Sequence, residues 1–134
     1  MDNFAFRKLD VYDLSKTLVR QVYCLIKKFP VEERYALCDQ LRRSAVSVLS
    51  NIAEGMGRYS NKEQVHFLEI SYGSLCEVYS QLDIAMDLGF ITPEEFEEMS
   101  TLIERVAKML SGLRAKRLSF EPAAPLSPLS GIRQ

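Results

Sequence analysis

The chain has a single histidine, His66, which follows Glu63 at the Glu-x-x-His spacing that places two metal ligands on one helix face. A di-iron bundle needs two such motifs and two further carboxylates, which one chain with one histidine cannot supply. The three cysteines, Cys24, Cys38 and Cys76, are too widely spaced to complete a zinc site with this histidine. The sequence therefore predicts no metal and no other cofactor.

The sequence also lacks the signatures of an enzyme. It contains no G-x-S-x-G or S-x-x-K nucleophile motif and no second histidine that could act as a general base. Gly55-Met-Gly57 is a G-x-G run, but it follows a helical segment rather than a strand, so it does not indicate a dinucleotide-binding loop. We therefore expect a protein without enzymatic activity.

The charged residues nearly balance, with 17 basic against 18 acidic side chains and a net charge of −1. A dedicated nucleic-acid-binding domain is usually strongly basic, so the balance argues against one. The charge is uneven along the chain, however. Residues 1–60 contain 10 basic and 7 acidic side chains (+3), whereas residues 61–134 contain 7 and 11 (−4). This asymmetry permits a local basic face that contacts nucleic acid or a protein partner, with Arg20, Lys27, Lys28, Arg42, Arg43, Arg58 and Lys62 as the candidate cations.

Two of these cations suggest an anion site at the start of a helix. Arg58 and Lys62 flank Ser60, behind which the backbone N–H groups of a helical first turn are free to bind an anion. The alternative is a capped helix end with solvated charges.

A polar stripe runs along the segment at residues 33–56. Its members recur every three or four residues and therefore share one face of a helix. A solvent-facing surface is the simplest explanation. However, Ser47 and Asn51 are mediocre helix formers where Glu or Lys would serve better on an exposed face. The stripe is therefore either a solvated face, a buried polar seam between helices or a subunit interface; it comprises Gln40, Arg43, Ser47, Asn51 and Glu54.

Four segments repeat apolar residues at helical spacing, and none alternates with the period of a strand. Pro30 ends the first segment, because the residue before a proline is pushed out of the helical conformation. The connections are short, about four to six residues, so sequential helices run antiparallel. We expect an all-α, up-down-up-down four-helix bundle over residues 1–118, with helices at about 10–28, 33–56, 61–88 and 93–116.

The last two helices each begin with a capping-box pattern. Ser60 precedes Glu63, and Thr92 precedes Glu95, so that each pair can satisfy two free backbone N–H groups. The helical pattern stops after Leu118. Residues 119–134 contain three prolines and several serines, and we expect them to form a disordered tail.

The sequence also carries information on cellular location. No apolar run approaches the roughly 18 residues that cross a bilayer, and the first residues lack the basic segment and apolar core of a signal peptide. The cysteines do not form the pattern of a disulfide framework, as is usual in a reducing compartment. We therefore expect a cytoplasmic location.

Three runs of sequence resemble a known family. The run QLRRSAVSVLSNIAEGMGR, residues 40–58, is similar to the signature of the bacterial four-helix-bundle proteins of the 23S ribosomal RNA intervening-sequence family. FLEISYGSLCE, residues 67–77, is similar to the third-helix motif of that family, and FRKLDVY, residues 6–12, fits its N-terminal part. The resemblance covers about residues 4–116. Leu49 stands where the family commonly has proline, so a straighter second helix is expected.

The resemblance implies a homopentamer, often a barrel-shaped ring, without an established enzymatic activity. In such a ring each subunit offers two different patches, which would explain the polar stripe as an interface. The resemblance also implies a relation to the accessory protein of diversity-generating retroelements, which binds a reverse transcriptase and nucleic acid. Those accessory proteins are markedly basic and this chain is not. We expect a non-enzymatic oligomeric scaffold or binding protein, with a nucleic-acid-binding accessory protein that acts with a reverse transcriptase as the alternative.

Overall fold

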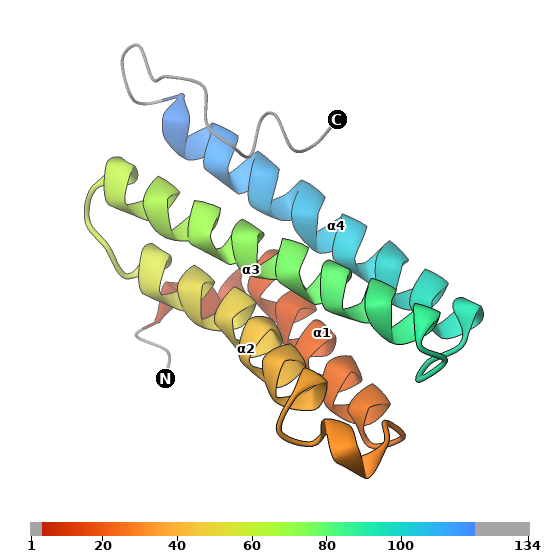
Figure 1. Ribbon diagram of the computed structural model, residues 1–134. Coiled ribbons are helices and arrows are strands. Elements are labelled where there is room, and N and C mark those ends of the chain that lie inside the picture. The colour runs from red at the N-terminus through yellow and green to blue at the C-terminus, as the bar shows by residue number, and fades with distance from the viewer. Residues whose placement is uncertain (1–3, 120–134) are drawn as a thin grey trace.

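The computed structural model describes residues 4–119 of the chain. Successive α-helices run in opposite directions and pack against their neighbours, and the first also packs against the last, which closes the bundle (Figure 1). The fold is therefore all-α with four packed helices, as the sequence predicts. The predicted tail lies outside the described residues, apart from Ser119. The elements are η1 (Ala5–Lys8), α1 (Asp10–Ile26), η2 (Val31–Glu33), α2 (Leu37–Met56), α3 (Asn61–Asp87) and α4 (Pro93–Leu118), where η marks a 3₁₀ turn.

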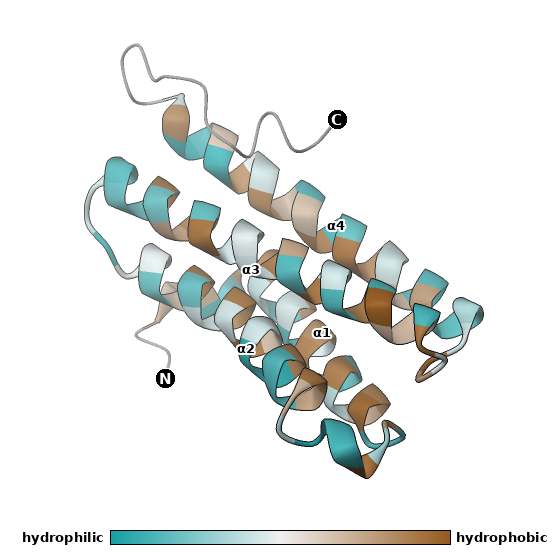
Figure 2. Ribbon diagram, in the orientation of Figure 1, coloured by the Kyte–Doolittle hydropathy of each residue, from teal (hydrophilic) through white to brown (hydrophobic). Residues whose placement is uncertain are grey.

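The core consists of apolar side chains that recur every three or four residues on each helix. Hydrophobic and hydrophilic residues alternate around all four helices (Figure 2), and most of the large apolar side chains are buried between the helices. Burying one leucine or valine in this way stabilises the fold by roughly 1.5–3 kcal/mol. The largest fully buried side chains are Leu18, Val22, Leu41, Val48, Ile52, Leu68, Leu75, Val78, Leu82, Val106 and Leu110.

The connection between the first two helices is longer than the sequence predicts. α1 ends at Ile26 rather than near residue 28, and α2 begins at Leu37 rather than near residue 33. Between them, Ala36 takes φ −117° and ψ −102°, outside the helical region. The carboxylate of Glu33 accepts a hydrogen bond from the Leu37 N–H at 3.3 Å and so satisfies a free donor of α2. The pattern could not reveal this break, because the intervening Glu and Arg residues are good helix formers.

The starts of α3 and α4 agree with the predicted caps. The Thr92 hydroxyl accepts the Glu95 N–H at 3.1 Å, and the Glu95 carboxylate accepts the Thr92 N–H at 2.9 Å, which completes the capping box. At α3 the Ser60 hydroxyl accepts the Glu63 N–H at 3.1 Å, but the box there lacks its reciprocal bond. α3 ends before Gly89, whose φ of +79° lies in the left-handed region that favours glycine.

α2 and α3 form the most extensive helix pair of the bundle. A Cβ atom added to Gly55 would lie 2.8 Å from the Cβ of Phe67, which is closer than real Cβ contacts come. The Ser71 hydroxyl donates to the Val48 carbonyl of α2 at 2.7 Å. Small residues therefore bring the two helices close together and fix the surface that carries the polar stripe.

An ion pair between a buried arginine and a partly buried glutamate joins α3 to α4. Arg114 is 5% exposed, and its Nε donates to the carboxylate of Glu69 at 2.8 Å. The contact lies at the end of the bundle where α4 finishes, and it fixes the position of the last turns of α4 on α3. The pair is not evident from the sequence, because a cation near a helix C-terminus is usually solvated.

Candidate functional site

The polar stripe divides into a half-buried centre and exposed ends. The Ser47 hydroxyl lies 2.7 Å from the hydroxyl of Ser74 on α3. The Asn51 side-chain amide donates to the carbonyl of Ser47 at 2.9 Å and to its hydroxyl at 3.0 Å. Within one chain, the polar seam therefore consists of Ser47 and Asn51 on the α2 side. The other members of the stripe are exposed: Gln40, Arg43 and Glu54.

Sequence reasoning missed the partners of this seam on α3. Ser71 and Ser74 are both buried, and each hydroxyl bonds to a group of α2. The sequence does contain an indication of these contacts, because the two serines stand at core-facing positions of a helix, where a hydroxyl requires a hydrogen-bond partner. The periodicity did not show on which helix those partners lie.

Beside the stripe, α3 presents exposed residues that recur every three or four positions. Ile70 and Ile84 are 39% and 45% exposed, although they are large and apolar. Gly73 lies between them, and a Cβ atom added there would meet nothing within 4 Å. No contact within the described chain therefore accounts for this glycine, which weakens the helix. We call this surface the outer face; it comprises the polar stripe, Ser50 of α2, and Ile70, Gly73, Glu77, Ser80 and Ile84 of α3.

The seven predicted cations do not gather in one patch. Most of them form exposed pairs with neighbouring side chains. Such a pair contributes only about 0–1 kcal/mol to stability, so it exchanges partners easily. Four cations are bound by neighbouring side chains within 3.1 Å: Arg20 by Thr17, Lys28 by Glu95, Arg43 by Asp39 and Arg58 by Glu54.

The predicted anion site at the start of α3 is occupied by groups of the protein itself. The Ser60 hydroxyl caps the helix, as described above. The guanidinium of Arg58 lies over the ring of Phe67, with its Cζ 4.8 Å from the ring centre. Lys62 is exposed in the first turn of the helix. These contacts favour the alternative of a capped helix end with solvated charges.

Lys27 and Arg42 do meet at one place, together with a third cation. They line a hollow of about 400 Å³ between the end of α1, η2 and the first turns of α2. Arg34 lines the same hollow, and its carbonyl accepts a hydrogen bond from the Arg42 guanidinium at 3.0 Å. We call this cavity the basic hollow. Sequence reasoning missed Arg34 as a member, because it took the connection for the first turn of the second helix.

The floor of the basic hollow is apolar. Phe29 and Cys38 line it and are 7% and 4% exposed. Burial raises the pKa of the Cys38 thiol; Arg42 opposes this shift and Glu33 adds to it. The thiol is therefore neutral at pH 7 and acts as a small apolar side chain.

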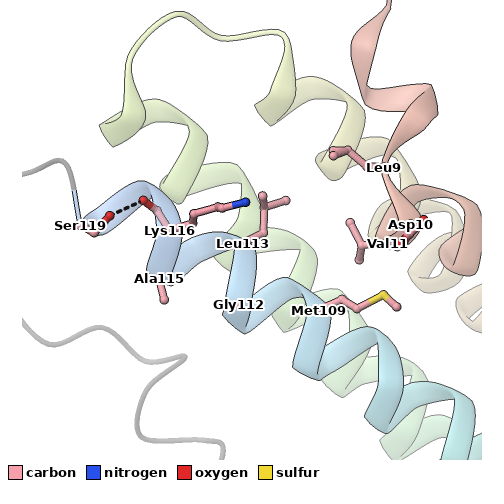
Figure 3. A pocket seen from close by; sticks show the side chains of 9 residues that line it. All are labelled: Leu9, Asp10, Val11, Met109, Gly112, Leu113, Ala115, Lys116 and Ser119. Atoms are coloured by element: carbon pink, nitrogen blue, oxygen red, sulfur yellow. Dashed lines mark hydrogen bonds between the residues drawn. The ribbon is translucent and has the colours of Figure 1, made fainter.

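A larger groove of about 560 Å³ lies at the other end of α1, against the last turns of α4 (Figure 3). Its surface is mainly apolar, with Leu9, Val11, Met109 and Leu113 among the residues that line it. Among the residues that line it, Asp10 and Lys116 are the only charged ones. The groove therefore offers a mainly apolar surface for binding.

The Glu63 and His66 pair is exposed on α3, and the His66 ring packs against the ring of Phe67 at 5.3 Å. Among residues 4–119, no three His, Cys, Asp or Glu side chains lie close enough together to hold a metal ion. The described helices also include none that is both long and apolar enough to span a membrane.

Comparison with known proteins places the chain in a family. Its fold is similar to that of a protein of unknown function from the S23 ribosomal protein family of Bacteroides thetaiotaomicron, with a TM-score of 0.71 and 24% identity. The alignment covers 78% of this chain and 97% of the other, and at this identity it shows the fold alone. No curated protein matches the chain. Residues 7–112, most of the chain, match the 23S rRNA-intervening sequence protein family, and the chain belongs to that family.

Proposed function

We propose that this protein is a non-enzymatic scaffold whose copies assemble through the outer face of α2 and α3. The main support for the proposal is that one face of α3 carries both Gly73 and the exposed Ile70 and Ile84. No contact within the described chain explains this glycine. Glycine lets a second helix approach closely, and large apolar side chains at either end contribute burial on association.

The polar centre of the outer face is compatible with a buried interface. Ser47 bonds to Ser74, and Asn51 bonds to Ser47, so these groups already have partners within the chain. Burying a polar group is costly mainly when it loses its hydrogen bonds. A second copy can therefore cover the Ser47 hydroxyl and the Asn51 side-chain nitrogen without leaving these two groups unsatisfied.

The spacing of the exposed residues also suits helix packing. On α3 the members of the outer face are three and four residues apart in turn, which is the repeat of helices that pack along their length. The family resemblance implies a homopentamer, and a cyclic assembly requires two different patches on every subunit. We assign the outer face to one of those patches.

Sedimentation velocity with the double variant Ile70→Glu/Ile84→Glu tests this proposal. We expect the wild-type chain to sediment as an oligomer and the variant as a monomer, because the substitutions replace with charged groups the two large apolar side chains whose burial favours association. The matched control is Tyr59→Glu, since Tyr59 is fully exposed in the α2–α3 connection, outside the outer face. A wild-type chain that stays monomeric at high concentration contradicts the proposal, as does a double variant that assembles normally.

A second candidate is a nucleic-acid-binding accessory protein that acts with a reverse transcriptase. It is supported by the exposed ion pairs of Arg43 and Arg58, which phosphate groups can replace at little cost. It predicts RNA or DNA binding that weakens steeply as salt increases and that falls when Arg42, Arg43 or Arg58 becomes alanine. Absence of binding at low salt would remove this candidate, whereas the scaffold proposal would stand.

A further inference from the structure

We propose that the basic hollow binds a small organic anion with an aromatic body, such as an aromatic carboxylate, sulfonate or phosphate ester. The inference goes beyond the scaffold function and does not depend on assembly. It rests on the combination of a cationic rim and an apolar floor in one cavity of about 400 Å³. Ligand cavities in proteins are commonly about 300–1,000 Å³, so the volume suits a small molecule.

Three cations from three parts of the chain form the rim. Lys27 follows α1, Arg34 follows η2, and Arg42 lies in the second turn of α2. None of the residues that line the hollow is acidic. Within the described part of the chain, no carboxylate lies within 4.0 Å of the charged groups of Lys27 or Arg34. An anion can therefore bind without first displacing a partner from these two cations.

Arg42 is held in place in a different way. Its Nη2 donates to the Arg34 carbonyl at 3.0 Å and lies 3.8 Å from the carboxylate of Asp39. The backbone contact fixes the guanidinium over the hollow, while the carboxylate is too distant for a strong hydrogen bond. Because a guanidinium has five N–H donors, Arg42 keeps donors available for a ligand.

The floor selects for an apolar body on the anion. Phe29 and Cys38 are buried beneath the hollow. The Cys38 thiol donates a weak hydrogen bond to the Ile26 carbonyl, with the sulfur 3.8 Å from the oxygen. Tyr23, which is 42% exposed, supplies an aromatic wall. Val31, which is 67% exposed, adds a further apolar side chain to the hollow. An inorganic anion or a nucleic-acid backbone would use the rim but would leave the exposed apolar surface of Tyr23 and Val31 uncovered. An aromatic anion uses both, because its ring covers apolar surface while its charge meets the rim.

Fluorescence titration with 8-anilinonaphthalene-1-sulfonate provides a direct test, since this probe joins an aromatic body to one anionic group. We expect saturable binding with one site per chain. The double variant Lys27→Ala/Arg34→Ala should bind the probe at least tenfold more weakly. Both residues are exposed, so the variant should fold normally. The matched control, Arg20→Ala/Lys62→Ala, removes the same charge away from the hollow and should change the dissociation constant less than twofold.

Two further measurements separate this site from simple charge attraction and from other apolar surfaces. Sulfate alone should displace the probe only at concentrations far above those of the probe. Backbone amide shifts in NMR spectra should locate the probe at Phe29 and Val31 rather than at the groove of Met109 and Leu113. Non-saturable binding, an equal effect of both double variants, displacement by sulfate at probe concentration or shifts confined to the other groove would each overturn the proposal.

Discussion

The hydroxyl of Ser47 on α2 lies 2.7 Å from the hydroxyl of Ser74 on α3, at the centre of the surface that we assign to assembly. This contact explains why weak helix formers occupy the middle of the polar stripe. The two serines are small enough for the helices to approach closely, and each supplies the hydrogen-bond partner of the other. The stripe is therefore hydrogen-bonded to the neighbouring helix within a single chain, independently of assembly.

The Ser47–Ser74 contact should be measurable as a coupling between the two positions. Ser47→Ala and Ser74→Ala should each lower the free energy of unfolding by about 1 kcal/mol, and the double variant by less than the sum. Urea denaturation of the three variants measures this coupling. Ser50→Ala is the control, because Ser50 is exposed on the same helix and should gain slightly in helix propensity. Strict additivity would show that the hydroxyls do not interact.

Two glycines should respond to the same substitution with opposite signs. Gly55→Ala should destabilise the chain by about 1–2 kcal/mol, because the added methyl group collides with Phe67 across the α2–α3 contact. Gly112→Ala, where an added Cβ meets nothing within 4 Å, should stabilise it by about 0.5–1 kcal/mol through helix propensity. Thermal and urea unfolding of both variants checks the prediction. A Gly55→Ala variant as stable as Gly112→Ala contradicts the close approach.

Removing the carboxylate of Glu69 should destabilise the bundle strongly. Glu69→Ala leaves the 5% exposed Arg114 without the carboxylate to which it donates, and removing the partner of a buried charge in this way costs about 3 kcal/mol. The exposed Glu104→Ala, on α4, serves as control and should change stability by less than about 0.5 kcal/mol. Chemical denaturation distinguishes the two. Equal stabilities for the two variants would mean that Arg114 finds adequate solvation elsewhere.

The contact of Lys28 with Glu95 should make stability depend on pH in the acidic range. The hydrogen bond from Lys28, followed by the bond from the Thr92 backbone, holds the pKa of Glu95 below its ordinary value of 4.5. A carboxyl with a lowered pKa in the folded state contributes stability above its ordinary pKa and loses it as the pH falls through the folded value. The variant Glu95→Gln should therefore lose less stability than the wild type between about pH 5 and pH 3.

The control for this pH series is Glu94→Gln, which removes a charge from the same helical turn but keeps the contact with Lys28. Its stability should decline with pH as that of the wild type does. If Glu95→Gln and Glu94→Gln show the same profile, the Lys28 contact does not contribute to the pH dependence.

The helices were predictable because their signals are local. Pro30, the two capping patterns and the glycine after α3 each act on the backbone within a few residues, so the sequence alone locates the ends of α3 and the start of α4 to within a residue. The start of α2 was not predictable, because η2 and the turn at Ala36 interrupt a run of good helix formers. There the tertiary contact of the connection outweighs helix propensity.

The candidate site was predictable only in part, because its members come from different elements. Periodicity placed Ser47 and Asn51 on one helix face, but it could not reveal their contact with Ser74. The charge asymmetry selected Lys27 and Arg42 as candidate cations, yet Arg34 joins them only through the path of the connection. Such groupings depend on how helices pack, and a single sequence carries little direct information about packing.

The central claim is that copies of the chain assemble through the outer face, and the variant Gly73→Gln tests it most directly. A Cβ atom added at position 73 meets nothing within 4 Å, and the substitution replaces a weak helix former, so the isolated bundle should be as stable as the wild type or more so. Gly112→Gln on α4 is the matched control. Sedimentation velocity should show an oligomer, a homopentamer by our account, for the wild type and for Gly112→Gln, but a monomer for Gly73→Gln. A monomeric wild type, or a Gly73→Gln variant that assembles like the wild type, would contradict the account.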